Sequence, residues 1–239
     1  MLFRKCIALA GLLVLTLSGY KTLKDEYIAM FNGKDLSQWE GDPKYWRVEN
    51  GVMIGEITPE TVIKVNTFLI WKGHAPQNFD LRVDYRISAK GNSGVNYRST
   101  RVDSLPYALK GYQLDLDGKD KYGLGYPRHS GQNYEERGRQ FLATRGQCTV
   151  IQPDGKPTFI DSTGTRAGLL SHINYDGWNT LRIVAQGNNL KHYINGVLMS
   201  EVTDNDPVNR RFDGLIGVQV HVGGPMKVEY KGWKLKGLE

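Results

Sequence analysis

The stretch from Leu81 to Arg98 constrains the fold most, because its side chains alternate between apolar and polar. Side chains of a β-strand point to opposite faces with a period of two residues. Such alternation is typical of antiparallel strands that bury one face. We therefore predict two strands joined by a Gly-rich connection, with one face on a core. The other face should form the floor of a polar groove, and it carries Arg82, Asp84, Arg86, Asn96 and Arg98.

The rest of the chain continues this β pattern through residues 27–238. The dipeptide Asn195-Gly196 and the tripeptide Pro153-Asp154-Gly155 are hairpin signals. No sustained helical period, internal repeat or linker interrupts the pattern, and 239 residues suit one large all-β domain. We expect a single jelly-roll sandwich of two antiparallel sheets.

The first 19 residues have the features of a secretory signal peptide. Arg4 and Lys5 precede an apolar run from Ile7 to Leu17, which is too short to span a bilayer comfortably. Tyr20 stands where a bacterial lipoprotein would need a lipid-bearing Cys. We therefore expect an exported protein, periplasmic or extracellular, that is not lipidated at this position and has no stable membrane partner.

Charge and cysteine content exclude further classes of protein. The formal charge of +6 comes without a Lys/Arg run or a basic helix, so we expect no nucleic-acid partner. After removal of the signal segment, Cys148 is the single cysteine. An internal disulfide and a cysteine-based zinc site are thus excluded.

Two later strands repeat the alternation and extend the predicted groove. In residues 111–117 the polar positions include Gln113 and Asp115, and in residues 215–223 they are Gln219 and His221. Amides, guanidinium groups and carboxylates suit a polyhydroxylated ligand, because each hydroxyl both donates and accepts hydrogen bonds. We expect a carbohydrate to contact Asp84, Arg86, Asn92, Asn96, Arg98, Gln113 and Gln219, with Tyr122 and Tyr126 stacking on the sugar.

Residues 118–146 form the longest stretch without alternation. The segment is rich in Gly, Tyr and charged residues, and it contains His129 and Glu135-Glu136. Long connections in compact domains are usually lids or binding loops. We therefore expect a loop excursion over the groove rather than a pair of sandwich strands.

Seven segments in their order along the chain resemble one known family. They are FNGKDLSQW, FDLRVDYRI, GNSGVNYRS, GYQLDLDG, GRQFLATRG, WNTLRIVAQGNNLKHYING and GLIGVQVHVGGPMKVEYKGWKLKGL. Together they look like the bacterial 3-keto-disaccharide hydrolase-type domain, over about residues 27–238. This resemblance implies a concanavalin A-like jelly roll and hydrolase or lyase chemistry on glycosides oxidised at C3.

Such chemistry requires a base, an oxyanion holder and an acid. A ketone at C3 acidifies the hydrogen on C2, and the glycosidic oxygen on C1 can then leave by elimination before water adds back. His221 is the best candidate for the base, because its ordinary pKa lies near neutrality, and Asp115 is the rival. Arg98 or Arg86 could hold the oxyanion. No cofactor is required, although a divalent metal ion is an alternative holder.

Two other functions compete with this enzyme. A non-catalytic carbohydrate-binding module on the same fold needs aromatic platforms and hydrogen bonds, but no tuned base. A jelly-roll endoglucanase uses Glu-x-Asp-x-Glu on a groove strand, and the equivalent positions here are Gln113, Asp115 and Asp117. Because Gln113 cannot act as a carboxylate nucleophile, this second alternative is disfavoured.

Overall fold

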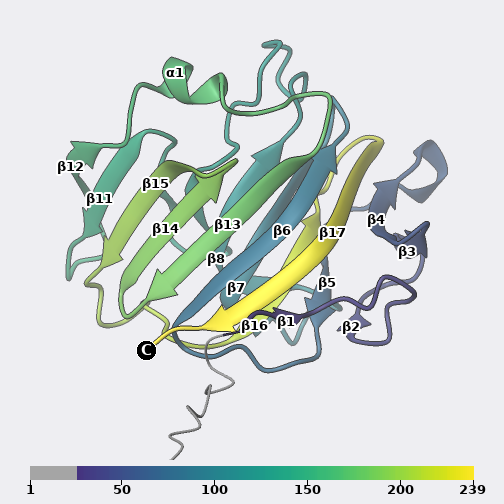
Figure 1. The fold of residues 1–239 in the computed structure, drawn as a ribbon, viewed down its shortest axis with the longest axis horizontal. Helices are drawn as coiled ribbons and strands as arrows, with labels where there is room; N and C mark the ends of the chain where they lie inside the picture. The colour runs from purple at the N-terminus through teal and green to yellow at the C-terminus, as the bar shows by residue number, and fades with distance from the viewer. Residues whose placement is uncertain (1–25) are drawn as a thin grey trace, which may run out of the picture.

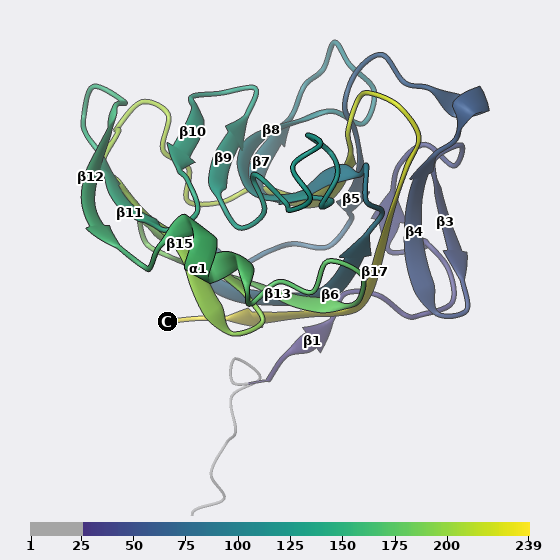
Figure 2. The same ribbon diagram turned by 90° about the horizontal axis from the view of Figure 1, so that it is seen from above.

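The computed structural model of the chain describes residues 26–239, so the expected signal segment and Tyr20 lie outside the described residues. Two β-sheets pack face to face (Figures 1 and 2), which confirms the predicted all-β sandwich. Helix is limited, within the described part, to α1 (Arg166–Leu170) and a 3-10 turn at Pro59–Thr61. None of the helices between residues 26 and 239 is long and apolar enough to cross a membrane.

The larger sheet has ten strands and the smaller sheet has seven. In spatial order the larger sheet contains β12 (Pro157–Ser162), β11 (Gln147–Ile151), β15 (Val197–Asp204), β14 (Asn189–Ile194), β13 (Asn179–Gln186), β6 (Phe79–Ile87), β17 (Met226–Gly237), β4 (Val52–Ile57) and β3 (Trp46–Glu49), and β1 (Ile28–Ala29) pairs with β17. The smaller sheet contains β10 (Gln140–Ala143), β9 (Asn133–Glu136), β8 (Leu109–Asp117), β7 (Asn92–Arg101), β16 (Leu215–Val220), β5 (Thr67–Trp71) and β2 (Trp39–Glu40). Pairing is antiparallel except between β11 and β15.

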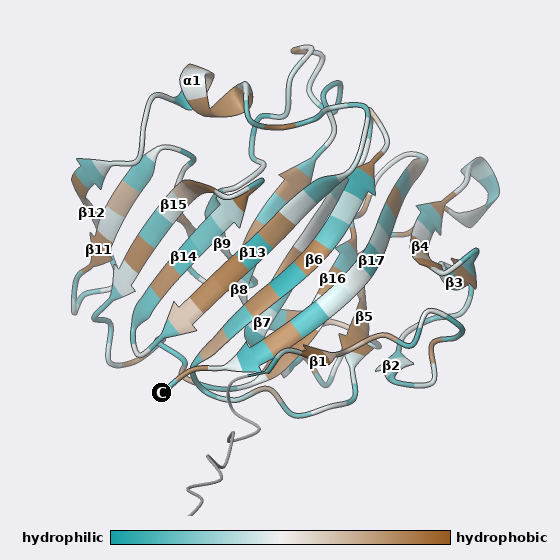
Figure 3. Cartoon of the chain, viewed as in Figure 1, coloured by the Kyte–Doolittle hydropathy of each residue, from teal (hydrophilic) through white to brown (hydrophobic). Residues whose placement is uncertain are grey.

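The inner faces of the two sheets form one core. Alternate residues such as Val83 on β6, Val95 on β7 and Leu114 on β8 are fully buried there. Figure 3 shows this alternation as brown and teal bands along β6, β13 and β14. Burial of apolar surface contributes about 25 cal/mol per Å², so the period-two pattern decides which face of each strand turns inward.

The two strands of residues 81–98 lie in different sheets, so they do not share the polar groove that was predicted for them. β6 lies between β13 and β17 in the larger sheet, whereas β7 lies between β8 and β16 in the smaller sheet. Residues 88–91 therefore carry the chain from one sheet to the other. Alternation identifies the buried face of a strand but not its neighbours, so it could not reveal this crossing.

Turn signals were more informative about pairing. Asn50-Gly51 and Asn195-Gly196 have positive φ angles and connect β3 to β4 and β14 to β15, as expected for tight hairpins. The expected excursion of residues 118–146 needs correction, because β9 and β10 pair with each other and extend the smaller sheet from β8. The loop is limited to residues 118–132.

Candidate functional site

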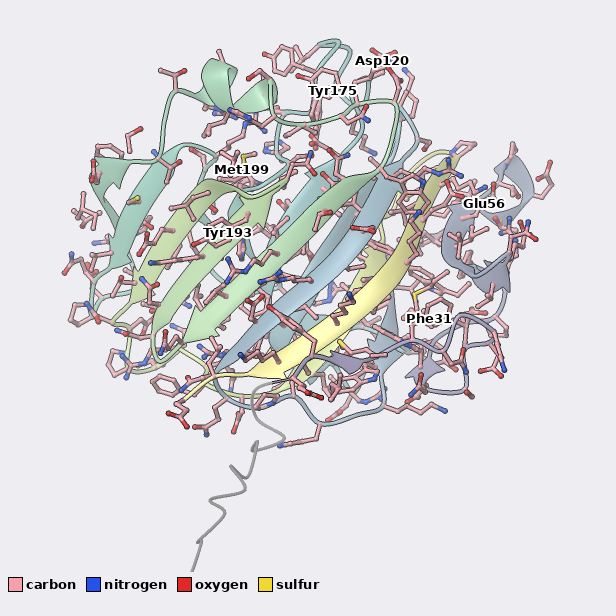
Figure 4. All side chains as sticks on the ribbon, in the orientation of Figure 1. Phe31, Glu56, Asp120, Tyr175, Tyr193 and Met199 are labelled. Carbon is pink, nitrogen blue, oxygen red and sulfur yellow. The ribbon has the colours of Figure 1, made fainter. Side chains whose placement is uncertain are left out.

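A pocket of about 370 Å³ lies on the outer face of the smaller sheet, opposite the core. Its floor comes from β7, β8 and β9, and the loop of residues 118–132 supplies one wall. Asp120 of this loop is labelled near the top of Figure 4. The pocket is lined by Asn66, Asn92, Gln113, Asp115, Tyr122, His129, Gln132, Tyr134, Glu136, Arg137, Phe141 and His221.

Asp115, in the middle of β8, has its carboxylate held from both sides. Its Oδ1 accepts a hydrogen bond from Gln113 Nε2 at 2.5 Å, and its Oδ2 accepts one from Gln132 Nε2 at 2.5 Å. Burial raises the pKa of Asp115 to about 7, with further increases from the charges of Asp117 and Glu136. The two amides oppose this rise without cancelling it. Asp115 is thus a carboxyl group that can exchange protons near neutral pH.

His221 follows the end of β16 and faces the same pocket. Its Nδ1 lies 2.7 Å from the carbonyl oxygen of Val222, and because a carbonyl only accepts, Nδ1 carries the proton. Burial lowers the pKa of His221, and the nearby charge of Lys121 lowers it further. The imidazole is therefore neutral at pH 7, and Nε2 has a free lone pair.

Glu136, at the end of β9, brings a second carboxylate to the pocket. It accepts hydrogen bonds from Arg137 Nη1 at 2.8 Å and from Asn66 Nδ2 at 3.1 Å, both on Oε1. Gln219 Nε2 lies 3.4 Å from Oε2. The ion pair with Arg137 compensates the charge of Glu136, and it places a guanidinium group at the pocket wall.

Aromatic rings form the wall nearest the loop. Tyr122 packs edge-on against His129 with ring centroids 5.1 Å apart, and Phe141 lies 5.8 Å from His129 and 5.2 Å from Tyr134. Tyr122 and Phe141 remain exposed, so their faces are available to a ligand. An aromatic wall beside convergent polar groups suits the apolar face of a sugar ring.

The structure brings five of the predicted site residues to this pocket: Asn92, Gln113, Asp115, Tyr122 and His221. Gly94 makes room for one of them, because a Cβ at this position would lie 2.5 Å from Gln113 Cδ. Because Gly94 has no side chain, the amide of Gln113 can lie over β7 at this position. The roles of the five residues stay predictions.

Asn96 and Gln219 lie below the pocket floor and are fully buried. The side-chain oxygen and nitrogen of Asn96 and the side-chain oxygen of Gln219 have no hydrogen-bond partner within the described chain. These two amides do not line the pocket, so the geometry does not support the predicted contact between them and a ligand. Their unpaired atoms leave the floor polar.

Asp84 and Arg86 are placed wrongly by the prediction, because β6 belongs to the larger sheet. On its outer face Asp84 accepts a hydrogen bond from Thr180 Oγ1 at 2.7 Å. Arg86 forms a two-pronged ion pair with Glu229, with distances of 2.5 and 2.9 Å. Neither residue lines the pocket.

Arg98 and Tyr126 are also away from the pocket. Arg98 has a positive φ and is buried, and it donates to the carbonyl oxygens of Gly187, Arg211 and Gln77. An irregularity in the pairing of β7 with β8 after Tyr97 breaks the alternation that placed Arg98 on the groove face. Tyr126 lines a different cavity.

Sequence reasoning missed most of the wall that β9, β10 and the loop supply. Tyr134 and Glu136 alternate with Asn133 and Glu135, so a period-two signal exists over four residues. It is too short to stand out within residues 118–146. The remaining missed residues are Asn66, His129, Gln132, Arg137 and Phe141, of which the sequence singles out only His129.

Comparison with known proteins identifies the family. Residues 26–236 match the model of the 3-keto-alpha-glucoside-1,2-lyase-like domain. The chain belongs to this family. Such a 3-keto-alpha-glucoside-1,2-lyase-like domain is indicative of action on glycosides. A 3-keto-disaccharide hydrolase of Bacteroides thetaiotaomicron is 31% identical over 103 residues, which are 40% of this chain and 32% of that protein. The match spans about a third of the relative's length.

Solved structures share the fold of this family domain. A candidate glycosyl hydrolase from Parabacteroides distasonis is 21% identical with a TM-score of 0.57, covering 90% of this chain and 95% of that chain. The carbohydrate-binding module CBM66 from Bacillus subtilis is 14% identical with a TM-score of 0.52, covering 84% and 96%. A Bacillus licheniformis β-glucanase is 11% identical with a TM-score of 0.51, covering 89% and 98%. These similarities confirm the predicted jelly-roll sandwich.

Carboxylates and imidazoles of the domain do not cluster as metal ligands. Over residues 26–239, no three His, Cys, Asp or Glu side chains lie together in a way that could hold a metal ion. Cys148, on β11, is a partly buried free thiol. Asp117 accepts hydrogen bonds from the backbone N–H groups of Arg128, His129 and Ser130, so it anchors the loop rather than serving as a second groove carboxylate.

Proposed function

We propose that this domain cleaves glycosides whose sugar is oxidised at C3, with His221 as the base and Asp115 as the acid. The observation that carries the proposal is the opposite displacement of two pKa values in one pocket. The pKa of His221 is lowered and that of Asp115 is raised to about 7. Pairs of groups whose environments push their pKa values in opposite directions commonly identify the acid and the base of a site.

The protonation states follow from these shifts. A neutral His221 has its proton on Nδ1, which is tied to Val222, so Nε2 can accept a proton. A substantial fraction of Asp115 is protonated at neutral pH and can donate a proton. The reverse assignment would require a protonated histidine beside an ionised Asp115, a state that both shifts disfavour. For this reason His221, and not Asp115, is assigned as the base.

The reaction then has two proton transfers and one bond cleavage. His221 Nε2 removes the hydrogen on C2, and the electron pair forms an enolate with the C3 ketone. The C1–O bond breaks as a C1=C2 bond forms, and the leaving oxygen takes the proton of Asp115. Addition of water, with its hydroxyl on C1 and its proton on C2, gives net hydrolysis. Each general acid–base contribution is typically worth 10²–10⁴ in rate.

Other residues of the pocket have supporting roles in this scheme. The Arg137 guanidinium, held against Glu136, is the cation at the wall that can stabilise the enolate oxygen. Asn92 and Gln113 present amides to sugar hydroxyls, and Tyr122 presents a ring face. In this scheme Arg137 takes the role of oxyanion holder that the sequence suggested for Arg86 or Arg98. We also propose export, on the signal-like residues 1–19.

The test is turnover of a 3-keto-disaccharide compared with its parent disaccharide. We expect cleavage of the oxidised sugar only, with solvent deuterium appearing at C2. The rate should fall by about tenfold per pH unit well above pH 7, because Asp115 loses its proton there. Loss of this alkaline decline in the residual activity of Asp115→Asn would assign the decline to Asp115. Cleavage of the parent sugar without exchange would instead indicate direct hydrolysis, for which Asp115 and Glu136 are the available carboxylates.

The same assay separates the enzyme from a carbohydrate-binding module. A module would bind the sugar, measured by calorimetry, but would neither cleave it nor exchange its C2 hydrogen. Binding without exchange in the presence and absence of chelator would therefore reject the proposed reaction and favour the module.

A further inference from the structure

A second cavity of about 710 Å³ lies on the other side of the loop that walls the first pocket. It is bounded by this loop and by α1, which lie at the same end of the sandwich (Figure 1). Tyr175 and Asp120 mark this end in Figure 4. The proposed reaction uses none of the cavity's lining residues, which are Leu124, Tyr126, Arg128, Arg145, Arg166, Ala167 and Leu170.

Three of these seven residues are arginines, and no carboxylate lines the cavity. Within residues 26–239, none of the three forms an ion pair with an acidic side chain. Arg139, by contrast, pairs with Glu135, Asp204 and Asp206. The buried Arg98 resembles Arg145 in donating to backbone carbonyl groups, but it lies outside this cavity. The arginine cavity therefore concentrates positive charge that the protein itself does not neutralise.

Backbone carbonyl groups hold these arginines in place without neutralising them. Arg145, only 1% exposed, donates to the carbonyl oxygens of Ser130 at 2.7 Å and Pro127 at 3.1 Å. Arg166 Nη2 donates to the carbonyl oxygen of Arg128 at 3.1 Å. Arg145 Nε also lies 3.4 Å from the carbonyl oxygen of Arg166 in α1, so the loop and α1 are joined through two guanidinium groups. A geometry fixed in this way is pre-organised for an incoming group.

Charges around Arg145 do not balance the site. Burial lowers the pKa of Arg145, and the neighbouring charge of Arg166 lowers it further. Asp117 acts in the opposite direction, but its carboxylate oxygens already accept hydrogen bonds from the loop backbone and from Ser130 Oγ. Buried charge without a counter-charge is costly, so an anion in the cavity would stabilise the fold.

We propose that the arginine cavity binds an oxyanion, namely a carboxylate, sulfate or phosphate group. Planar guanidinium groups match these anions with paired hydrogen bonds. The apolar side chains of Leu124, Tyr126 and Leu170 provide a surface for whatever carries the anion. Arg128 packs over the ring of Tyr122 at 5.6 Å, and Tyr122 lines the first pocket. The anion is therefore either a substituent of the glycoside in that pocket or a free ion.

The first experiment is calorimetric titration of the full chain with sodium sulfate at constant ionic strength. We expect saturable binding that weakens about tenfold in Arg166→Gln and in Arg128→Gln, since each removes a charge-assisted partner. Arg101→Gln is the matched control, because Arg101 pairs with Glu40 on the surface and does not line the cavity. Absence of saturable binding, or equal affinity in all four proteins, would overturn the proposal.

A second variant distinguishes loss of the anion site from misfolding as the cause of weaker sulfate binding. Arg166→Glu supplies a carboxylate where the cavity lacks one, so it should abolish sulfate binding while the melting temperature in sulfate-free buffer stays equal or rises. A lower melting temperature of this variant in sulfate-free buffer would contradict the charge imbalance on which the proposal rests.

The third arm distinguishes the source of the anion and rests on the proposed function. If the anion belongs to the substrate, sulfate should inhibit cleavage of a 3-keto-glycoside with a carboxylated leaving group competitively, but not cleavage of a neutral one. Equal effects on both would assign the site to a free ion. Sulfate binding that depends on Arg166, without turnover of any 3-keto-glycoside, would uphold the arginine cavity and reject the proposed function.

Discussion

The outer faces of the two sheets carry similar residues but use them differently. On the larger sheet, which faces the viewer in Figure 4 around Tyr193, charges meet opposite charges across strands. Asp80 accepts from Arg182 at 2.7 Å, and Arg86 pairs with Glu229. On the smaller sheet, Asp115 has amides but no cation as hydrogen-bond partners, and His221 pairs only with a carbonyl group.

The difference shows how partners, rather than residue types, create reactivity. Burial raises the pKa of Glu229, but the hydrogen bonds and charges of Arg86 and Lys227 together outweigh burial and lower it. Burial raises the pKa of Asp115 to about 7 because two neutral amides cannot compensate its charge. A carboxylate that is paired with a cation, like Glu229 on this paired face of the larger sheet, is therefore inert at neutral pH, whereas Asp115, which has only amides as hydrogen-bond partners, can take part in proton transfer.

The largest expected effect is on turnover. His221→Gln and Asp115→Asn should each lower turnover of a 3-keto-disaccharide by ~10²–10⁴-fold, because each removes a general acid–base group. Binding of the unreactive parent sugar should change much less. Asp84→Asn on the paired face is the control and should retain normal turnover. Comparable losses in Asp84→Asn would erase the functional distinction between the two faces.

Stability should depend on pH with opposite signs on the two faces. Because the folded pKa of Asp115 is raised, its contribution is fully present below pH ~4 and is lost as pH rises towards about 7. The loss is on the order of 4 kcal/mol, since the pKa is raised by about three units, and Asp115→Asn should remove it. The folded pKa of Glu229 is lowered, so its contribution appears above pH ~4 and is lost at lower pH.

Urea unfolding between about pH 2 and pH 8 measures both contributions. Asp115→Asn should flatten the decline towards pH 7, and Glu229→Gln should flatten the rise near pH 4. Identical pH profiles in the wild type and in Asp115→Asn would show that the carboxyl group is not perturbed in the folded state.

A smaller effect should follow from crowding the floor of the pocket. In Gly94→Ala the new methyl group would lie 2.5 Å from Gln113 Cδ, so the amide must move away from Asp115. We expect turnover to fall by about tenfold, a displacement effect of the kind expected when a positioning group shifts. Gly224→Ala, where nothing lies within 4 Å of the added atom and the backbone φ is not positive, tests general effects of replacing glycine. Unchanged turnover in Gly94→Ala would show that the position of the Gln113 amide does not affect the reaction.

The smallest expected effect concerns the paired face. Glu229→Gln breaks the ion pair with Arg86, whose side chain is 46% exposed, so the loss in unfolding free energy at pH 7 should be at most about 1 kcal/mol. Turnover should not change. A larger loss of turnover than of stability would show that this face communicates with the pocket.

Sequence alternation was sufficient to place Asp115, Gln113 and His221 on one face, because Asp115 and Gln113 lie on β8 and His221 directly follows β16, and both strands have a clear buried face. It failed for Asp84 and Arg86, since the choice of neighbouring strands depends on where residues 88–91 lead the chain. The fold class can be predicted from the alternation of apolar and polar residues added up over many strands, whereas a site depends on which strands are adjacent. Which strands are adjacent cannot be read from any short stretch of sequence.

The wall of the pocket was harder to predict for another reason. Glu136 sits on a four-residue strand. Gln132 lies in a loop, and its backbone carbonyl oxygen is 3.2 Å from Nδ1 of His192, a fully buried residue. Burial lowers the pKa of this histidine to about 3, so it is a neutral structural residue. Contacts between residues 60 positions apart are invisible to any short sequence window.

The loop of residues 118–132 has fixed ends and a free tip. Asp117 ties residues 128–130, and Gly118 donates to the carbonyl oxygen of Gly91. At the tip, Gly123 and Gly125 have open space around them, and the exposed Tyr122, Leu124 and Tyr126 face two different cavities. Insertions at such tips are tolerated because the anchored ends keep the scaffold intact. One short exchangeable segment can therefore diversify both cavities at once, which makes it the natural target for grafting new ligand preferences onto this sandwich.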